Sequence, residues 1–231
     1  MKYFIKNHGA RCPDDWQRVG KFYRLSRKCG TFIFPEPVSC ESEKISYRHI
    51  DNLISLDVAA KKIGHEKVFA ALGRALADIH NEDGKANVDK VIVHGDFGLV
   101  NLAWSEQQML PVIFDPIHAE FSPYKQSFGD RYFDLGQFVS TFFTPAFAGS
   151  YIFAGKMCFE KSVNAFLQSY SLVCSRSINT DKLLQFALIA HRLHFILRLK
   201  KRGPLFKAVA VWGIWLLRSM MKRKILCLTI D

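Results

Sequence analysis

Three side chains between residues 96 and 115 are of types that can support phosphoryl transfer to a hydroxyl. Asp96 follows the pair His94-Gly95, Asn101 comes five residues later, and Asp115 follows the apolar run 112–114. Such a transfer needs one carboxylate that orients the hydroxyl and accepts its proton. It also needs a second carboxylate and an amide oxygen that hold Mg²⁺ against the phosphates. Taken one at a time, each residue could also be an ordinary turn residue.

Short apolar segments are expected to position these side chains. The run 91–93 predicts a buried strand that leads into His94. The runs 102–104 and 112–114 predict a hairpin around the polar turn 105–108. Strand, loop and hairpin would therefore bring the two carboxylates and the amide to one place.

The remainder of the chain has strands in its first third and helices in its last half. Pro35 and Pro37 place one of these strands at a sheet edge. Strands followed by helices are typical of an α+β chain with two segregated layers or lobes. We expect strands at 2–6, 32–39 and 44–50, and helices at 13–30, 65–80, 131–143, 156–175, 181–200 and 204–224.

The sequence HGDFGLVN, from His94 to Asn101, resembles the H-G-D-x-x-x-x-N catalytic loop of the aminoglycoside phosphotransferase family, a branch of the protein-kinase-like fold. Three further segments resemble that family in order and approximate spacing. Residues 72–80 resemble the helix before the loop, 113–116 the metal-binding Asp segment, and 129–136 the G-D-P-x-x-D-L-A segment. Four pieces in order favour a motif over unrelated turns.

This resemblance implies a fold and a set of roles. The fold would be α+β and protein-kinase-like, with a short β-containing N-terminal lobe (1–52) and a larger, mainly helical C-terminal lobe (53–231). Asp96 would be the catalytic base, and Asn101 and Asp115 would be the metal ligands, with ATP and Mg²⁺ as cofactors.

The resemblance also implies supporting roles around the loop. Asp134 would brace the catalytic loop through hydrogen bonds, and Asp130 would help cap the helix that follows it. His94 is expected to pack beneath the loop and not to transfer protons.

The N-terminal part departs from the kinase-like pattern. It has no G-x-G-x-x-G segment to cover the nucleotide phosphates. Lys6 is the best-placed candidate for the phosphate-binding lysine, with Lys2 as the alternate, and an ordinary surface lysine is the other interpretation. The helix that follows has no Glu to pair with this lysine, so only Asp14 or Asp15 could substitute.

These departures leave several interpretations open. The sequence is a piece of a longer protein, an unusually minimal kinase or a degenerate member of the family. Residues 46–51 fall where the fold would place the hinge whose backbone binds an adenine.

Composition favours an anionic partner. The chain has 32 basic and 21 acidic side chains, a net charge of +11. No nucleic-acid-binding motif accompanies this charge, so no nucleic acid is expected. The six cysteines form no CxxC pair and are expected to be reduced thiols. The first residues lack the apolar run of a signal peptide, so a cytoplasmic location is expected.

The basic C-terminal region has two interpretations. The apolar stretch Ala208 to Leu217, with Trp212 and Trp215, is too short to span a bilayer. It is either a core helix with solvated basic ends or an interfacial helix in peripheral contact with an anionic membrane, at its inner face. In the second case a lipid-linked or lipopolysaccharide-type sugar would be a fitting acceptor.

Two functions from different classes therefore stand beside each other. The first is an ATP-dependent kinase that phosphorylates a hydroxyl of a small molecule or glycan. The alternative is a non-catalytic kinase-like module that binds a nucleotide or a glycan, which the missing Gly-rich segment and Glu favour.

Overall fold

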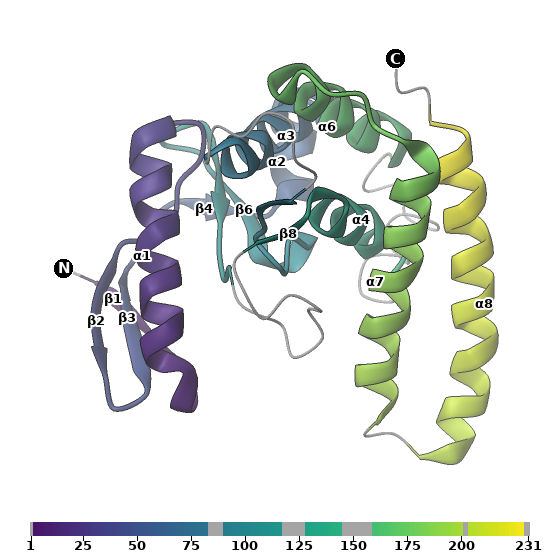
Figure 1. Ribbon diagram of the computed structural model, residues 1–231, viewed down its shortest axis with the longest axis horizontal. Coiled ribbons are helices and arrows are strands. Elements are labelled where there is room, and N and C mark those ends of the chain that lie inside the picture. Colours follow the sequence, from purple (N-terminus) through teal and green to yellow (C-terminus); the bar gives the residue numbers. More distant parts are fainter. Residues whose placement is uncertain (1, 83–89, 117–127, 145–158, 201–202, 229–231) are drawn as a thin grey trace.

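The structure is a computed structural model of the 231-residue chain. It describes residues 2–82, 90–116, 128–144, 159–200 and 203–228. A small sheet and a long helix lie at one end of the molecule, a mixed middle part carries the loop 94–101, and two long helices lie at the other end (Figure 1).

The N-terminal sheet has three antiparallel strands in the order β1-β3-β2. They are β1 (Tyr3–Asn7), β2 (Pro37–Glu41) and β3 (Lys44–Arg48). The predicted strands exist, although β2 begins five residues later than expected. Pro37 opens β2, and this strand lies at the sheet edge as predicted, where a residue without an N–H costs no ladder hydrogen bond.

Helix α1 (Cys12–Cys29) lies against this sheet (Figure 1). Its ends follow from its sequence. Pro13 occupies the first turn, where its missing N–H is not needed, and Asp14 and Asp15 are favoured there by the helix dipole. Gly30 ends the helix in the left-handed region at φ 68°.

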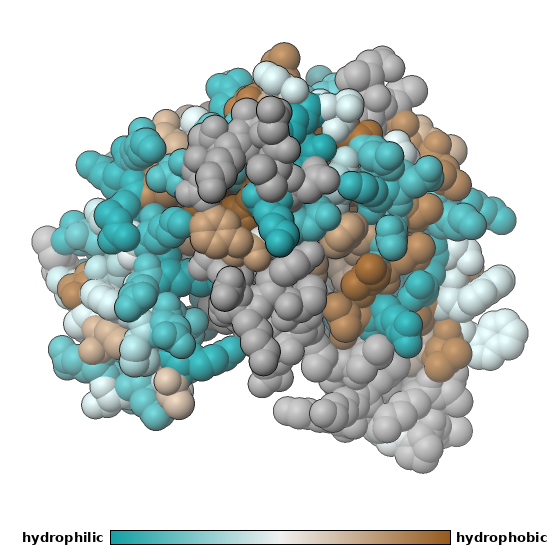
Figure 2. All heavy atoms as spheres, viewed as in Figure 1, coloured by the Kyte–Doolittle hydropathy of each residue, from teal (hydrophilic) through white to brown (hydrophobic). Residues whose placement is uncertain are grey.

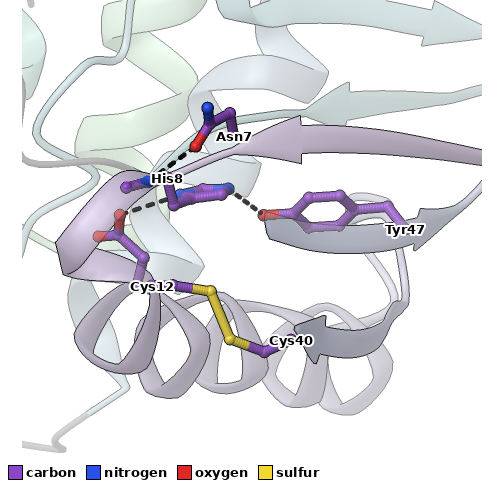
Figure 3. Close-up of a disulfide and its surroundings, with 7 residues drawn as sticks. Asn7, His8, Cys12, Cys40 and Tyr47 are labelled. Atoms are coloured by element: carbon purple, nitrogen blue, oxygen red, sulfur yellow. Dashed lines mark hydrogen bonds and ion pairs between the residues drawn. A yellow bond between two sulfur atoms is a disulfide. The ribbon is translucent and has the colours of Figure 1, made fainter. Parts of the chain in front are cut away.

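The expectation that all six cysteines are reduced thiols is wrong for one pair. Cys12, at the start of α1, and Cys40, in β2, form a disulfide with their Cα atoms 6.8 Å apart (Figure 3). No sequence pattern indicates this disulfide, because the partners are 28 positions apart and meet only when α1 packs on β2. Cys29, Cys174 and Cys227 are free thiols, whereas residue 158 lies outside the described residues.

The middle of the molecule holds two further small sheets. One has the order β4-β6-β7, with β4 (Leu53–Ile54), β6 (Leu102–Ser105) and β7 (Leu110–Ile113), so the predicted hairpin is confirmed. The other pairs β5 (Lys90–Ile92) with β8 (Phe128–Asp130). Strands β4 and β8 were not predicted because two or three residues are too few for an alternating pattern.

The helices predicted after residue 55 occur in the predicted order. Residues 56–63 form a further helix that was not predicted from the sequence. The predicted helix 156–175 begins at Phe159 in the described chain, and residues 156–158 lie outside it. The helices are α2 (Leu56–Ile63), α3 (His65–Asn81), α4 (Arg131–Thr141), α6 (Phe159–Cys174), α7 (Thr180–Lys200) and α8 (Pro204–Leu226).

Two close helix pairs make up the core of the C-terminal part. Helix α3 packs on α6, and α4 packs on α7, which in turn contacts α8 (Figure 1). Gly73 permits the close approach of α3 to α6, because a Cβ at this position would lie 2.1 Å from the backbone oxygen of Phe166. The predicted lobe boundary at residue 52 falls between β3 and β4, which belong to different sheets. The division into two lobes stays a prediction.

Helix α8 is not the core helix that one interpretation of the sequence expected. Its apolar stretch turns large side chains outward, with Trp212 77% and Trp215 65% exposed. Further along the helix, Met221 and Ile225 are fully buried. One side of α8 therefore packs on the protein while the tryptophans lie on its surface. None of the helices in the described part of the chain is long and apolar enough to cross a bilayer.

Candidate active site

The loop 94–101 leaves β5 in a conformation that its glycines make possible. Gly95 has φ 87°, a left-handed conformation that costs a residue with a Cβ about 1–2 kcal/mol. Gly98 lies so close to α4 that a Cβ would come within 2.8 Å of Thr141 Cγ2. Between them Phe97 is fully buried against Phe138 and Phe166. One aromatic side chain thus anchors the loop in the helical core.

Asp134 on α4 holds the start of the loop 94–101 through hydrogen bonds to its backbone. Its Oδ2 accepts from the backbone N–H of His94 at 2.6 Å, and its Oδ1 accepts from that of Gly95 at 2.9 Å. His80 Nε2 lies 3.1 Å from Oδ2. Burial alone would raise the pKa of this carboxyl, but the hydrogen bonds and nearby imidazoles outweigh burial and lower it. Asp134 is therefore an ionised, fully buried carboxylate that braces the loop as predicted.

The predicted cap on the same helix is also present. Asp130 lies just before α4, and its side chain accepts from the backbone N–H of Tyr132 at 2.9 Å. This bond satisfies one of the unpaired N–H groups of the first turn. The cap fixes where α4 begins, and hence where Asp134 points.

His94 connects the loop to the segment that carries Asp115. Its Nε2 donates to the backbone oxygen of Phe114 at 2.8 Å, and its Nδ1 accepts from the backbone N–H of Asp96 at 3.2 Å. These two partners define one neutral tautomer. Burial lowers the pKa of His94 to about 4, although Asp134 opposes the shift. A buried neutral imidazole in this position supports the loop, in line with the role expected for it.

Asp96 has a hydrogen-bond donor on each carboxylate oxygen. Asn101 Nδ2 donates to Oδ2 at 2.7 Å and also to the backbone oxygen of Asp96 at 2.9 Å. Gln137 Nε2 donates to Oδ1. Burial raises the pKa of the Asp96 carboxyl to about 6, since the two amide donors lower it by less and Asp115 and Asp134 add repulsion. A pKa just below neutral suits a general base.

Asn101 and Asp115 could hold a magnesium ion between them. Because the amide nitrogen of Asn101 is engaged by Asp96, the amide oxygen is the atom that points elsewhere. The backbone oxygen of Asn101 accepts from the backbone N–H of Phe114 at 2.9 Å, which holds the residue before Asp115 beside the loop. Amide and carboxylate oxygens are ligands that Mg²⁺ prefers.

The donor set is too small to hold a metal ion alone. Within the described residues no three His, Cys, Asp or Glu side chains gather as a metal cluster. Mg²⁺ bound by one or two protein groups completes its shell with waters and substrate phosphates. The residues present therefore fit a magnesium ion that arrives with a nucleotide.

Asp115 has an uncommon backbone conformation. Its φ is 51°, in the left-handed region that few residues other than glycine adopt. Such conformations persist where surrounding structure imposes them and are concentrated at functional sites. The preceding residue, Phe114, is hydrogen-bonded to His94 and to Asn101, which restrains the backbone that leads into Asp115.

Lys6 lies at this same site. Its Nζ forms an ion pair with Asp115 Oδ2, across 109 positions of the sequence. About a third of each side chain is exposed, so the pair contributes little to stability. A cation beside the carboxylate that is expected to bind the metal is well placed for a phosphate. The alternate, Lys2, is exposed on the surface.

The acidic residues at the start of α1 do not pair with Lys6 in the part of the chain that the structure describes. Asp15 Oδ2 instead lies 2.9 Å from His8 Nδ1, and His8 Nε2 lies 3.3 Å from the Tyr47 hydroxyl (Figure 3). The suggestion that Asp15 substitutes for the missing Glu is therefore wrong. This carboxylate is bound instead by His8, which is buried between β1 and α1.

Arg18 is a contact between α1 and the loop that was not predicted from the sequence, and it lies alongside the edge-to-face packing of Phe22 on His94. Its guanidinium donates to the backbone oxygens of Val93 and His94, both at 2.9 Å. Burial lowers the pKa of Arg18 to about 10, while Asp134 and Asp15 oppose the shift. Because its partners are backbone atoms 75 and 76 positions away, no local pattern marks this residue.

The predicted hinge is partly engaged in other bonds. The backbone N–H groups of Arg48 and His49 donate to the carbonyls of Glu36 and Lys2 at 2.9 and 3.0 Å. These two groups are therefore occupied within the sheet. Binding of an adenine by the other residues of this segment stays a prediction.

A narrow hollow opens beside the carboxylate of Asp96. Its volume of about 30 Å³ is enough for a water or a hydroxyl group but not for a sugar ring. Gln137 lines it and is only 8% exposed, and its Oε1 has no hydrogen-bond partner among the described residues. Gln137 could have been found from the sequence, because it is a polar residue one helical turn after Asp134 and lies on the same face of the helix.

Two solved structures share this fold over nearly the whole chain. The choline kinase LicA from Streptococcus pneumoniae matches with a TM-score of 0.53 at 13% identity, covering 96% of this chain and 85% of its own. A choline/ethanolamine kinase family protein from Mesorhizobium loti matches with the same TM-score and coverage at 11% identity. No family model matches the sequence, and no curated protein matches it. The likeness confirms the predicted α+β, protein-kinase-like fold.

Proposed function

We propose that this protein is a phosphotransferase that moves the γ-phosphate of ATP to a hydroxyl of a small molecule or glycan. The observation that carries the proposal is the arrangement around Asp96. A carboxyl with a pKa of about 6 borders a hydroxyl-sized hollow, and the loop that carries it also carries Asn101. The fold is shared with a choline kinase. The HGDFGLVN loop supports membership of the aminoglycoside phosphotransferase-like family.

Asp96 acts on the acceptor in this proposal. An acceptor hydroxyl in the hollow would donate to a carboxylate oxygen of Asp96, which aligns the hydroxyl oxygen with the γ-phosphorus. As the new O–P bond forms and the bond to the ADP oxygen breaks, the hydroxyl proton passes to Asp96. Asn101 and Gln137 keep the carboxylate oriented throughout.

The nucleotide would lie on the other side of Asp96. Asn101 and Asp115 would hold Mg²⁺, which neutralises phosphate charge when bound. Lys6 would exchange its contact with Asp115 for a contact with a phosphate oxygen, because its amine already lies at this carboxylate. Only the hydroxyl of the acceptor fits the hollow, so the body of the molecule would lie outside it. A sugar, including a lipopolysaccharide-type sugar, meets this requirement.

A non-catalytic binding module is the second candidate. The absence of a G-x-G-x-x-G segment from the sequence favours it, and so does Asp15, which is engaged by His8. Such a module would bind a nucleotide or glycan without transfer. The two candidates differ in what they predict for Asp96.

The decisive variant is Asp96→Asn, which keeps the shape of the side chain and removes the base. We expect transfer from radiolabelled ATP to fall by about 10²–10⁴-fold. The acceptors to be tried are choline, an aminoglycoside and a hexose. The Mg²⁺-dependent rise in melting temperature with ATP should persist, since the metal ligands are intact. Asp181→Asn, at an exposed carboxylate of α7, is the matched control.

Three outcomes separate the candidates. If Asp96→Asn loses transfer while the wild type and Asp181→Asn keep it, the result supports the kinase. A wild-type protein that is stabilised by ATP and Mg²⁺ but transfers to none of these acceptors supports the binding module. Full transfer by Asp96→Asn would show that the assigned base is wrong.

A further inference from the structure

Among the side chains that the structure describes, the largest group of exposed apolar residues on one element lies on α8. Val211, Trp212, Trp215 and Leu216 are 59%, 77%, 65% and 55% exposed. Their spacing of one, three and one residues puts them on one face of the helix. Figure 2 shows pale and brown side chains over this helix at the right-hand edge of the molecule. Tryptophan is the costliest of these side chains to leave in water because of its large apolar area.

Basic residues continue the same face toward the end of the helix. Lys222 and Arg223 follow Trp215 and Leu216 by seven residues each, two helical turns, and both are exposed. Leu226, 53% exposed, lies between them around the helix axis. The sequence of α8 contains no Asp or Glu. We call the seven residues Val211, Trp212, Trp215, Leu216, Lys222, Arg223 and Leu226 the tryptophan face.

The opposite side of α8 is fixed to the protein. Met221 and Ile225 are fully buried, and Lys224 forms an ion pair with Glu160 of α6. Helix α8 also contacts α7 along the molecule (Figure 1). The tryptophan face is therefore presented outward by a rigid helix, and it is about 23 Å long at 1.5 Å per residue.

We propose that the tryptophan face binds the surface of an anionic lipid bilayer, with the axis of α8 parallel to the membrane. Tryptophan is enriched at the boundary between headgroups and acyl chains, where its ring is in apolar surroundings and its N–H remains hydrated. Lysine and arginine on the same face are attracted to anionic headgroups. The proposed contact is peripheral, along one face of α8.

Charge argues for a bilayer over a second copy of the chain. A symmetric dimer through this face would bring Lys222 and Arg223 near their own copies, with no acidic residue on α8 to offset them. The whole chain carries a net charge of +11, which also disfavours self-association and favours an anionic surface. The proposal does not depend on phosphotransfer and is tested without it.

The test is co-sedimentation of the full chain with vesicles of phosphatidylcholine alone and of phosphatidylcholine with one quarter phosphatidylglycerol. We expect binding to the anionic vesicles at low salt that weakens as salt rises. Replacement of both rings in W212S/W215S should lower the partition coefficient at least about tenfold, since the buried apolar area is lost. Leu172→Ser removes an apolar side chain that is 81% exposed on α6 and should bind like the wild type.

A second variant tests the charges. Lys222→Gln with Arg223→Gln should lower binding to anionic vesicles roughly 30-fold, because each basic residue near the surface contributes a factor of about five. Lys61→Gln with Lys67→Gln removes two exposed lysines from α2 and α3 and is the matched control. All these side chains are exposed, and circular dichroism checks that each variant is folded.

Several results would overturn the proposal. One is no sedimentation of the wild type with anionic vesicles at low salt. Another is equal binding by the wild type and W212S/W215S. A third is a concentration-dependent dimer that W212S/W215S abolishes, with no binding to vesicles, which would assign the face to a second copy. Binding of the tryptophan face to a protein partner, without binding to anionic vesicles, would overturn the proposal as well.

Discussion

The loop 94–101 and the N-terminal sheet meet at one site, but the structure holds them in different ways. The loop start is fixed by Asp134, which is fully buried and accepts from two backbone N–H groups. The sheet reaches the site through the side chain of Lys6, which pairs with Asp115 where both are about a third exposed. The groups proposed for proton transfer are thus preorganised, whereas the group proposed for phosphate binding can exchange partners.

This difference matches the requirements of the proposed chemistry. A base has to keep one geometry, because small displacements from the reacting hydroxyl are costly. A lysine that binds a nucleotide has to release its resting partner when the phosphate arrives. Lys6 would do so at small cost, since a partly exposed ion pair of this kind is worth about 0–1 kcal/mol. Five variants test this comparison.

The largest effect is expected from Asp134→Ala. It leaves the N–H groups of His94 and Gly95 and the His80 ring buried without their acceptor. We expect the free energy of unfolding to fall by about 3–5 kcal/mol in urea titrations. The exposed control Asp181→Ala should change it by less than about 1 kcal/mol. Equal small losses in both variants would mean that the loop does not depend on Asp134.

Asp96→Asn should stabilise the protein, in contrast to Asp134→Ala. A carboxyl whose pKa is raised to about 6 on folding opposes folding whenever it is ionised. The wild type should therefore lose stability as pH rises from about 4 to 6, by up to about 3 kcal/mol on the linkage relation. The variant should not lose it. Urea titrations across this range check the sign, and parallel curves for the two proteins would refute it.

The pH dependence of activity in the wild type should also report the ionisation of Asp96. If Asp96 is the base, kcat/KM should rise with pH through an apparent pKa of about 6 as the carboxyl ionises. Gln137→Leu removes one donor from the carboxylate and should move this pKa upward. A profile that is flat from pH 5 to 8 would exclude Asp96 from proton transfer in the rate-limiting step.

Arg18 tests the connection between the two regions. Arg18→Met keeps the length of the side chain but removes a charged donor from two buried carbonyl groups. We expect a loss of about 2–3 kcal/mol in the free energy of unfolding. Arg24→Met, at an exposed position of the same helix, is the control. A loss no larger than that of the control would show that α1 is held on the loop by other contacts.

The smallest effect on stability is expected from Lys6→Met. Its ion pair should be worth less than about 1 kcal/mol in unfolding. The KM for ATP should nevertheless rise by roughly tenfold, because a phosphate loses its cation. Lys2→Met should change neither quantity. A raised KM in Lys2→Met alone would assign the phosphate contact to the alternate lysine.

The fold was predictable wherever one segment carried its own pattern. Val68, Leu72, Leu76 and Ile79 mark α3, and all four are fully buried. Pro13 and Gly30 mark the ends of α1. Strands β4 and β8 were missed because their few residues pair with distant strands. The tertiary pairing, and not a local pattern, creates them.

The candidate site likewise has a part that was predictable from the sequence and a part that was not. The sequence by itself determined the order and chemistry of Asp96, Asn101 and Asp115, because one short stretch with its own strand, loop and hairpin contains all three. Only the tertiary structure decided which partners they have. Gln137 reaches Asp96 across 41 positions, and Lys6 reaches Asp115 across 109.

The tertiary structure also decided which side of α8 faces outward and which cysteines join. An apolar stretch such as 208–217 predicts a helix, but it does not indicate whether that helix is buried or exposed, since the pattern is the same in both cases. Packing of Met221 and Ile225 against the protein is what leaves Trp212 and Trp215 in water. A sequence records which side chains are available locally, whereas contacts between distant segments depend on how the whole chain packs.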